Sequence, residues 1–399
     1  NPGPETLESR MRAPTLRGSK ASWLIQAAFI AAVVFLVWLV VDFTRSNLQA
    51  QGVTFGFGFL NRSTGWSVNY SLIPYSTADP YWKVLVIGLM NTLWLGAISL
   101  TLATVLGVLV AIARTVQNKV FNFIGLMFVE TFRNIPILLQ VFFWFAVFTN
   151  LPHPRNAISY GDMVFLSARG IFVPGLSVTM GMAFWALAAM LAGVGALIWI
   201  YGARRFKRIE PRARNRLALG VLAVTVLAAL ILLYLGRRPD TDLISIPARR
   251  GLNFSGGIQI GPEVSTMITA ITIYGAAYIS EIVRAGLISV GKGQLEAATA
   301  LGLSPWQTFT RIRMALAFRM ILPSLTNQYI WLIKATTLGI AVGFSDFFMV
   351  VAVSITQSGH TIELIAILMA GFLAINYTLA RVFNRINRAI ALPGARVGS

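Results

Sequence analysis

Long apolar runs recur along this chain, and each is long enough to cross the ~30 Å hydrocarbon core of a membrane. In lipid the backbone polar groups must be satisfied within the segment, so each run is expected to be a helix. The sequence therefore predicts an all-α, polytopic membrane protein with about eight transmembrane helices. The expected spans are 22–42, 84–113, 121–149, 178–202, 217–235, 263–284, 318–343 and 361–381.

The placement of charge agrees with a membrane protein. The charged fraction is 12% and the mean hydropathy is +0.71, whereas a soluble chain carries about 25% charge. The net charge of +19 does not indicate a nucleic-acid partner, because the basic residues lie in short loops beside apolar spans. Of the 33 basic residues, 22 lie on the side that carries both termini and 9 on the other. The positive-inside rule then predicts cytoplasmic termini.

The segments outside the spans contain no recognisable soluble domain. The run 22–42 is longer than a signal-peptide core and lacks a cleavage site, so it is expected to be a retained anchor. The segments 43–82 and 236–262 are expected to be external loops. The expected division is a cytoplasmic tail (1–21), a first helix with its external loop (22–83), a main transmembrane domain (84–390, with core 84–150 and 263–390 and insertion 151–262) and a second tail (391–399).

The polar stretch 292–314 stands between two apolar segments. Residues 294–301 have high helix propensity, and Gly302 can adopt the left-handed conformation that ends a helix. Ser304 can cap a second helix, with Pro305 at its first position and Gln307 completing a capping box. The pattern predicts two short helices bent at a glycine, with Leu301, Leu303, Trp306 and Phe309 available to a groove. An interfacial loop lying on the bilayer explains this pattern equally well.

The same stretch and its surroundings resemble the polar amino-acid permeases of ATP-binding-cassette (ABC) importers. In that family a Glu-Ala-Ala triplet is followed after three residues by Gly and after nine more by Ile, as in Glu296, Gly302 and Ile312. The segments that carry the resemblance are Asn91–Leu93, Gly107–Arg114, Glu130–Gln140, Tyr278–Val290, Gly293–Ala298 and Lys334–Leu338. The overall length is similar to that of the long permease subunit of general L-amino acid uptake systems.

The resemblance implies an ABC importer type I permease fold with a cytoplasmic coupling helix in a bacterial inner membrane. The residues implied to couple to the ATPase are Gln294, Glu296, Ala297, Ala298, Gly302, Ser304 and Trp306. The implied partners are a pair of ABC ATPase subunits, a second homologous permease, a periplasmic amino-acid-binding protein, L-amino acids and membrane lipid. Two positions depart from the family pattern: Ala315 replaces a proline, so helix can continue there, and Ala335 replaces an acidic residue.

Charged residues inside the spans are the candidates for the substrate path, because an ionisable group in a membrane is costly and usually faces a partner or a pathway. Glu130 and Arg133 lie three residues apart, on one helix face, and either pair with each other or line the path. Lys334, with Thr337, either lines the path or snorkels or contacts another subunit. Glu281, with Arg284, is expected to support the polar stretch. Glu363, His360 and His153 are expected to be loop or surface residues.

Catalysis is not expected in this chain. It has no cysteine and only two histidines, so no metal site is expected, and no Gly-x-x-x-x-Gly-Lys-Ser/Thr loop is present. ATP and Mg are therefore expected on the partner ATPase, with no cofactor in this chain. The alternatives are an ion-coupled secondary transporter, which would more often show paired halves with interrupted helices and buried acids, and a membrane enzyme.

Overall fold

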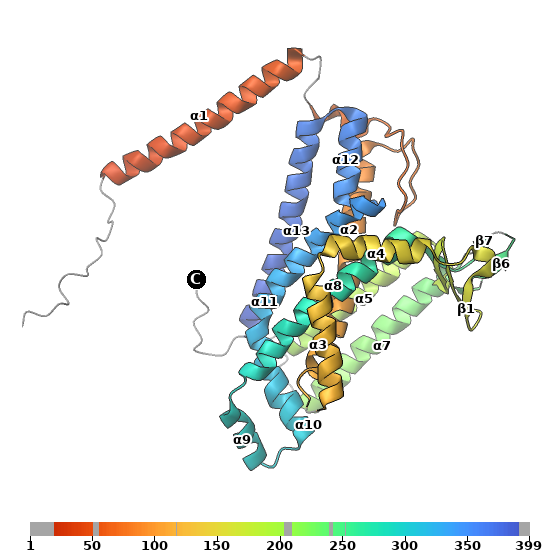
Figure 1. The fold of residues 1–399 in the computed structure, drawn as a ribbon, viewed down its shortest axis with the longest axis vertical. Coiled ribbons are helices and arrows are strands. Elements are labelled where there is room, and N and C mark those ends of the chain that lie inside the picture. Colours follow the sequence, from red (N-terminus) through yellow and green to blue (C-terminus); the bar gives the residue numbers. More distant parts are fainter. Residues whose placement is uncertain are drawn as a thin grey trace, which may run out of the picture.

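The computed structural model describes residues 20–50, 56–116, 118–202, 210–238, 242–251 and 253–390. The expected tails 1–21 and 391–399 lie almost entirely outside these residues. Helices dominate, and a group of short strands projects from one side (Figure 1).

Among the described residues, six helices are long and apolar enough to cross a membrane. They are α1 (Lys20–Ala50), α2 (Tyr81–Ala113), α5 (Met180–Gly202), α7 (Pro211–Leu235), α8 (Pro262–Ser289) and α13 (Thr361–Ile390). Each contains one of the expected spans, apart from a few residues at the ends. Two bent helix pairs bring the number of possible spans to eight, so the predicted number of crossings agrees with the structure.

The expected span 121–149 consists of two helices, α3 (Lys119–Asn134) and α4 (Ile137–Thr149), bent by 104°. Pro136 causes the break, because it lacks an N–H group and forces the preceding Ile135 into an extended conformation with φ −89° and ψ 123°. The buried Gln140 donates from Nε2 to the carbonyl oxygens of Phe132 at 2.9 Å and Ile135 at 3.0 Å. Carbonyls freed by the break are thus satisfied within the protein.

The expected span 318–343 is not one regular helix either. Helix α11 (Met314–Lys334) passes into a 3₁₀ segment, η5 (Ala335–Val342), and then, after a 48° bend, into α12 (Phe347–Ser358). Gly343 has φ +77° at the end of η5, and Asp346 caps α12 by accepting from the Met349 backbone N–H at 2.8 Å. Asn91 of α2 donates to the carbonyl oxygens of Tyr70 and Ser345, which fixes the bend against α2.

The insertion 151–262 contains β-strands that the all-α prediction missed. Helices α5 and α7 pack on each other, while the segments beyond them form a four-stranded sheet, β1–β2–β3–β8, and two two-stranded sheets, β4–β5 and β6–β7. The strands are β1 (Ile158–Tyr160), β2 (Val164–Ser167), β3 (Gly170–Val173), β4 (Gly175–Leu176), β5 (Ile244–Ser245), β6 (Ala248–Arg250), β7 (Asn253–Ser255) and β8 (Ile258–Ile260). The segment 236–262 was expected to be a loop, but it contains the four strands β5 to β8.

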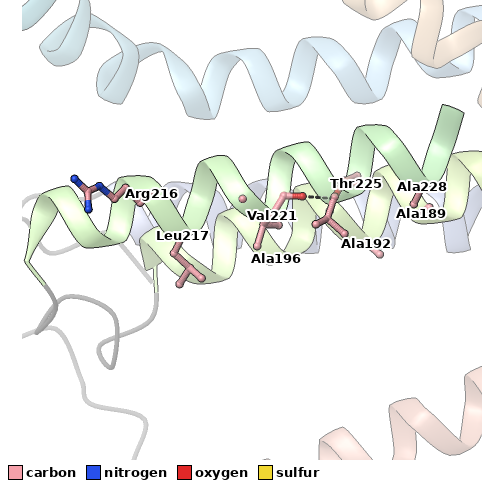
Figure 2. A pocket seen from close by; sticks show the side chains of 11 residues that line it. Ala189, Ala192, Ala196, Arg216, Leu217, Val221, Thr225 and Ala228 are labelled. Atoms are coloured by element: carbon pink, nitrogen blue, oxygen red, sulfur yellow. Dashed lines mark hydrogen bonds between the residues drawn. The ribbon is translucent and has the colours of Figure 1, made fainter. Parts of the chain in front are cut away.

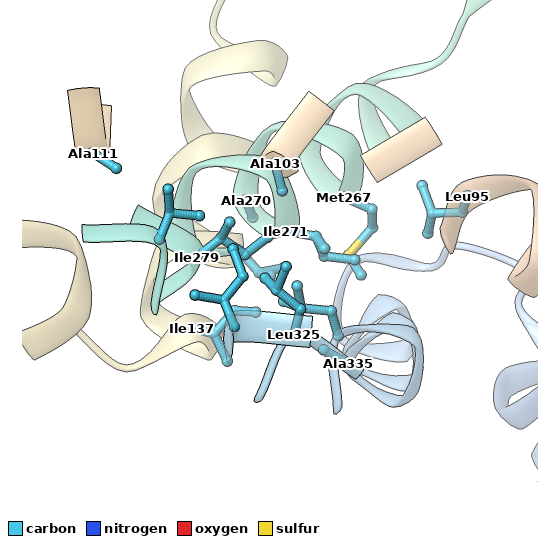
Figure 3. Packing of buried hydrophobic residues seen from close by; sticks show 14 of the residues in the cluster. Leu95, Ala103, Ala111, Ile137, Met267, Ala270, Ile271, Ile279, Leu325 and Ala335 are labelled. Atoms are coloured by element: carbon cyan, nitrogen blue, oxygen red, sulfur yellow. The ribbon is translucent and has the colours of Figure 1, made fainter. Parts of the chain in front are cut away.

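The main hydrophobic core lies between α2, α4, α8 and α11 (Figure 3). Small residues let α2 and α8 approach closely. A side chain at Gly107 would meet Ile279 at 2.9 Å and the Ala276 carbonyl oxygen at 3.0 Å, and one at Gly275 would meet Ala103 at 3.0 Å. Such small residues support helix packing in lipid, where close van der Waals contact replaces the hydrophobic effect.

A second core joins the start of α2 to α12, α13 and the 3₁₀ helix η2 (Phe57–Asn61). His360 and Glu363 lie beside this core and are 7% and 4% exposed, so their expected surface placement was wrong. The His360 ring stacks on Phe59 with centroids 4.3 Å apart, and its Nδ1 lies 3.3 Å from a Glu363 carboxylate oxygen that accepts from the Gly56 N–H at 2.8 Å. These contacts attach the segment before α2 to the α12–α13 turn.

Helix α1 stands apart from the helical body (Figure 1), and none of the residues in its apolar window Trp23–Val40 is buried.

Substitution of Gly107 by Leu tests the α2–α8 contact. Because the first added carbon already meets Ile279 and a backbone oxygen, we expect Gly107→Leu to destabilise the protein by about 1–3 kcal/mol. The measurement is thermal unfolding of the purified chain in detergent. Gly181→Leu, where an added Cβ meets no atom within 4 Å, is the control, and equal melting temperatures of the two variants would contradict the packing argument.

Candidate functional site

The polar stretch 292–314 forms a bent pair of short helices at one end of the helical body (Figure 1). The first, α9 (Lys292–Ala300), ends at Gly302, which has φ +74°. The Gly302 N–H donates to the Thr299 carbonyl at 2.9 Å and the Leu303 N–H to the Ala298 carbonyl at 3.1 Å. This is a Schellman end, which confirms the expected left-handed glycine.

Ser304 starts the second helix as expected. Its Oγ accepts from the Gln307 N–H at 3.3 Å, and the Gln307 side chain accepts from the Ser304 N–H at 2.9 Å. Helix α10 (Pro305–Gln307) continues through a π-helical stretch, η4 (Thr308–Arg313), directly into α11. The absence of proline at Ala315 is consistent with this continuity, which was expected. We call residues 292–313 the elbow.

The elbow presents an apolar tip. The Leu301 side chain is 81% exposed and the Trp306 side chain 72% exposed. Phe309, expected to share this surface, is half-buried, stacks on Trp306 at 6.2 Å and packs against the main core. Ala298 is 3% exposed and packs inside the elbow. The other residues implied in coupling are exposed: Gln294, Glu296, Ala297, Gly302, Ser304 and Trp306.

The base of the elbow is joined to α8. The Arg313 Nε donates to the Leu287 carbonyl at 3.0 Å, close to the end of α8. Leu295 and Phe309 pack against the main core. The elbow therefore contacts α8 directly and continues into α11.

An ionic cluster lies one turn deeper. Glu281 of α8 accepts from Arg114, at the end of α2, and from Arg284 at 3.0 Å. The expected Glu281–Arg284 support is thus present, and sequence reasoning missed Arg114, whose side chain is only 8% exposed. The Arg114 carbonyl also accepts from Asn122 of α3 at 2.9 Å. The cluster joins α2, α3 and α8 beside the elbow.

Glu130 and Arg133 share a helix but do not pair with each other. Glu130 contacts Asn134, while the Arg133 guanidinium lies 5.0 Å from the centre of the Tyr278 ring. In the described part of the chain no carboxylate forms an ion pair with Arg133. The interpretation of a mutually neutralising pair is therefore wrong, and Arg133 interacts with an aromatic face instead.

Aromatic side chains extend from Arg133 towards Lys334. Tyr278 packs on Tyr274 at 4.8 Å, and Tyr274 stacks on Trp331 at 5.3 Å. Lys334 follows Trp331 by three residues and so shares its helix face. Thr337 bonds only to the Lys334 carbonyl among the described residues, at 2.8 Å. We call Arg133, Tyr278, Tyr274, Trp331 and Lys334 the aromatic track.

A cavity of about 570 Å³ lies between α3, α8 and α11 at the Arg133 end of the track. Its wall carries Arg133 and Glu281 among mainly small and apolar side chains. Its size is in the range of small-molecule sites. Among the described residues, no group of three or more His, Asp or Glu side chains could hold a metal ion.

Comparison with known proteins identifies the family. The family model described as "binding-protein-dependent transport system inner membrane component" matches residues 217–391, a range that contains the elbow. The putative amino-acid ABC transporter permease YhdX of Escherichia coli is 37% identical over 385 residues, 95% of each chain. This chain belongs to the ABC-transporter permease family. The general L-amino acid transport system permease AapQ of Rhizobium johnstonii is 33% identical over 92% of this chain and 91% of the relative.

The permease is thus a multi-pass inner-membrane subunit of an ATP-driven importer. The glutamate/glutamine/aspartate/asparagine transport permease BztB of Rhodobacter capsulatus is 32% identical over 90% of both chains. These long relatives align over most of this chain, so their match includes the insertion 151–262. None of these matches supports the ion-coupled alternative.

The ionic cluster generates a prediction for Glu281→Gln. The substitution leaves the buried Arg114 guanidinium without its carboxylate, and we expect a loss of stability on the order of 3 kcal/mol. Thermal unfolding of the purified permease in detergent measures it. Glu130→Gln removes an exposed carboxylate without an ion pair and should unfold like the wild type. If Glu281→Gln and Glu130→Gln unfold at the same temperature, the cluster does not hold α2 to α8.

Proposed function

We propose that this permease imports L-amino acids, that it receives them from a periplasmic binding protein, and that it docks on a separate ABC ATPase through the elbow. The observation that carries the proposal is the elbow itself, a doubly capped pair of helices with an exposed Leu301 and Trp306 at its tip. The substrate class is supported by the long relatives, whose names all specify amino-acid transport.

The local hydrogen bonds and the contacts of the elbow allow a docked ATPase to displace it as one rigid unit. Local hydrogen bonds cap the end of α9 and the start of α10, so the bend between the two helices does not depend on a partner. Its tip offers large apolar side chains of the kind that anchor a helix in a groove. Its base contacts Leu287 and the main core. Closure of ATPases around ATP and Mg would move α8 and α11 and so alternate the access of the path.

The permease acts as half of a pore. It carries one elbow, whereas an importer with two ATPases needs two docking points. We propose that the second is supplied by a different homologous permease, giving a heterodimer. The excess of basic residues on the elbow side supports cytoplasmic termini and a cytoplasmic elbow.

The aromatic track is the proposed substrate path. An amino acid carries a carboxylate, which the Arg133 guanidinium or the Lys334 ammonium attracts. It also carries an ammonium group, which the faces of Tyr278, Tyr274 and Trp331 can accept. Neither cation forms an ion pair with a carboxylate of the described residues, so both are available to a passing carboxylate.

Replacing Gly302 by Val tests docking. At φ +74° a β-branched residue is strained, although an added Cβ meets no atom within 4 Å. We expect Gly302→Val to insert into the membrane but to lose most of its ATPase binding and substrate-stimulated ATP hydrolysis. Gly302→Asn is the control, because asparagine tolerates the left-handed conformation, and it should retain coupling. Normal transport by Gly302→Val would remove the docking role.

Arg133→Met and Lys334→Met test the path. Each substitution keeps the approximate length of the side chain and removes its charge. We expect the apparent affinity for amino-acid uptake to fall about tenfold or more while the complex assembles normally. Arg381→Met is the matched control, since Arg381 lies at the same 5.0 Å from an aromatic ring, that of Tyr377 on α13, and neither residue belongs to the track. Unchanged uptake in both track variants would show that the track is structural, and loss of assembly would assign these residues to helix contacts.

A further inference from the structure

Helices α5 and α7 enclose a groove that the transport function does not use. Its volume is about 670 Å³, and Figure 2 shows the side chains that line it. Ala189, Ala192 and Ala196 line it from α5, and Gly220, Val224 and Ala228 from α7. Its floor is a close contact, because a side chain at Gly193 would meet Thr225 at 2.3 Å. Its walls are mainly apolar, and large apolar side chains such as Leu219 and Leu191 are exposed on the surrounding helix faces.

One end of the groove is basic. Arg216 is part of the groove wall, and Figure 2 shows it at the end where the α5–α7 connection begins. Arg212 and Arg214 lie on the same first turns of α7. The sequence adds four basic residues between 204 and 208, outside the described residues.

These arginines lack protein counter-charges. In the part of the chain that the structure describes, no carboxylate oxygen lies within 4.0 Å of Arg212, Arg214 or Arg216. The Arg214 guanidinium lies 5.3 Å from the Tyr201 ring, and its buried Nε has no hydrogen-bond acceptor. An unpaired buried donor is costly. Of the three, Arg216 presents its guanidinium at the groove itself, and Arg212 and Arg214 add positive charge close to that end.

We infer that this groove is a binding site for an anionic phospholipid, with one acyl chain between α5 and α7 and the phosphate headgroup at Arg216. The apolar groove leads to a basic end. A phospholipid has the matching arrangement, because its apolar tail leads to a negatively charged headgroup. Basic pockets between membrane helices favour anionic headgroups, and each arginine near the surface contributes about fivefold in affinity. A packed helix would fill the apolar part but would leave the arginines unpaired, which favours the lipid as the occupant.

The test uses the full chain, purified with its partner subunits and stripped of lipid. Equal amounts of dioleoylphosphatidylglycerol and dioleoylphosphatidylcholine are added, and the lipids retained on the protein are counted by native mass spectrometry. We expect one tightly held lipid, with phosphatidylglycerol preferred by more than about tenfold. Equal retention of the two lipids overturns the proposal.

Two leucine variants test the groove. At both Gly220 and Gly195 an added Cβ meets no atom within 4 Å, but only Gly220 lines the groove. Gly220→Leu should lose the retained lipid, whereas Gly195→Leu, on the same hairpin, should keep it. Identical retention in these variants would overturn the assignment. So would loss of a partner subunit from Gly220→Leu with lipid retention unchanged, because a helix would then be the occupant.

A charge variant tests the headgroup. Arg216→Gln should lower the preference for phosphatidylglycerol about fivefold, and the triple change Arg212→Gln, Arg214→Gln and Arg216→Gln should abolish it. Arg237→Gln, beyond the opposite end of α7 and outside the groove, should leave it unchanged. Retention of full preference by the triple variant would contradict a headgroup at this end.

Discussion

The close packing of α2 against α8 is the contact on which the rest of this permease depends. It is possible because Gly107 and Gly275 carry no side chain where the two helices meet. The same helix pair is joined at its end by the Arg114–Glu281 ion pair. Removing either feature would weaken the contact between α8, which leads into the elbow, and α2, which begins in the second core.

Helix α8 serves three surfaces at once. One face packs on α2, another presents Tyr274 and Tyr278 to the aromatic track, and its last turn accepts from Arg313 of the elbow. The elbow and the lining of the proposed path are therefore attached to the same helix. Under the proposed function, ATPase closure at the elbow would act on the substrate path through this one helix.

Broken helices in this protein retain their hydrogen bonding through side chains. Gln140 donates to the carbonyls that the α3–α4 bend leaves free. Asn91 does the same at the α11–α12 bend, where it donates to the Ser345 carbonyl. Lipid cannot supply such partners, so a bend at membrane depth requires a buried amide or hydroxyl nearby. The two bends are thus built into the packed core rather than being loose hinges.

Local signals in the sequence determined the helical spans, the proline break and the caps of the elbow. Apolar length, the missing N–H of Pro136 and the short-range partners of Gly302 and Ser304 act within a few residues, so they are legible without the fold. Only the tertiary structure decided which charges meet. It placed Arg114 on Glu281, separated by 167 positions, moved Arg133 onto Tyr278 instead of Glu130, and buried His360 against Phe59. It also paired β3 with β8, strands that α5 and α7 separate in the chain. These contacts join residues far apart in sequence, and their energies depend on helix packing that no local pattern encodes.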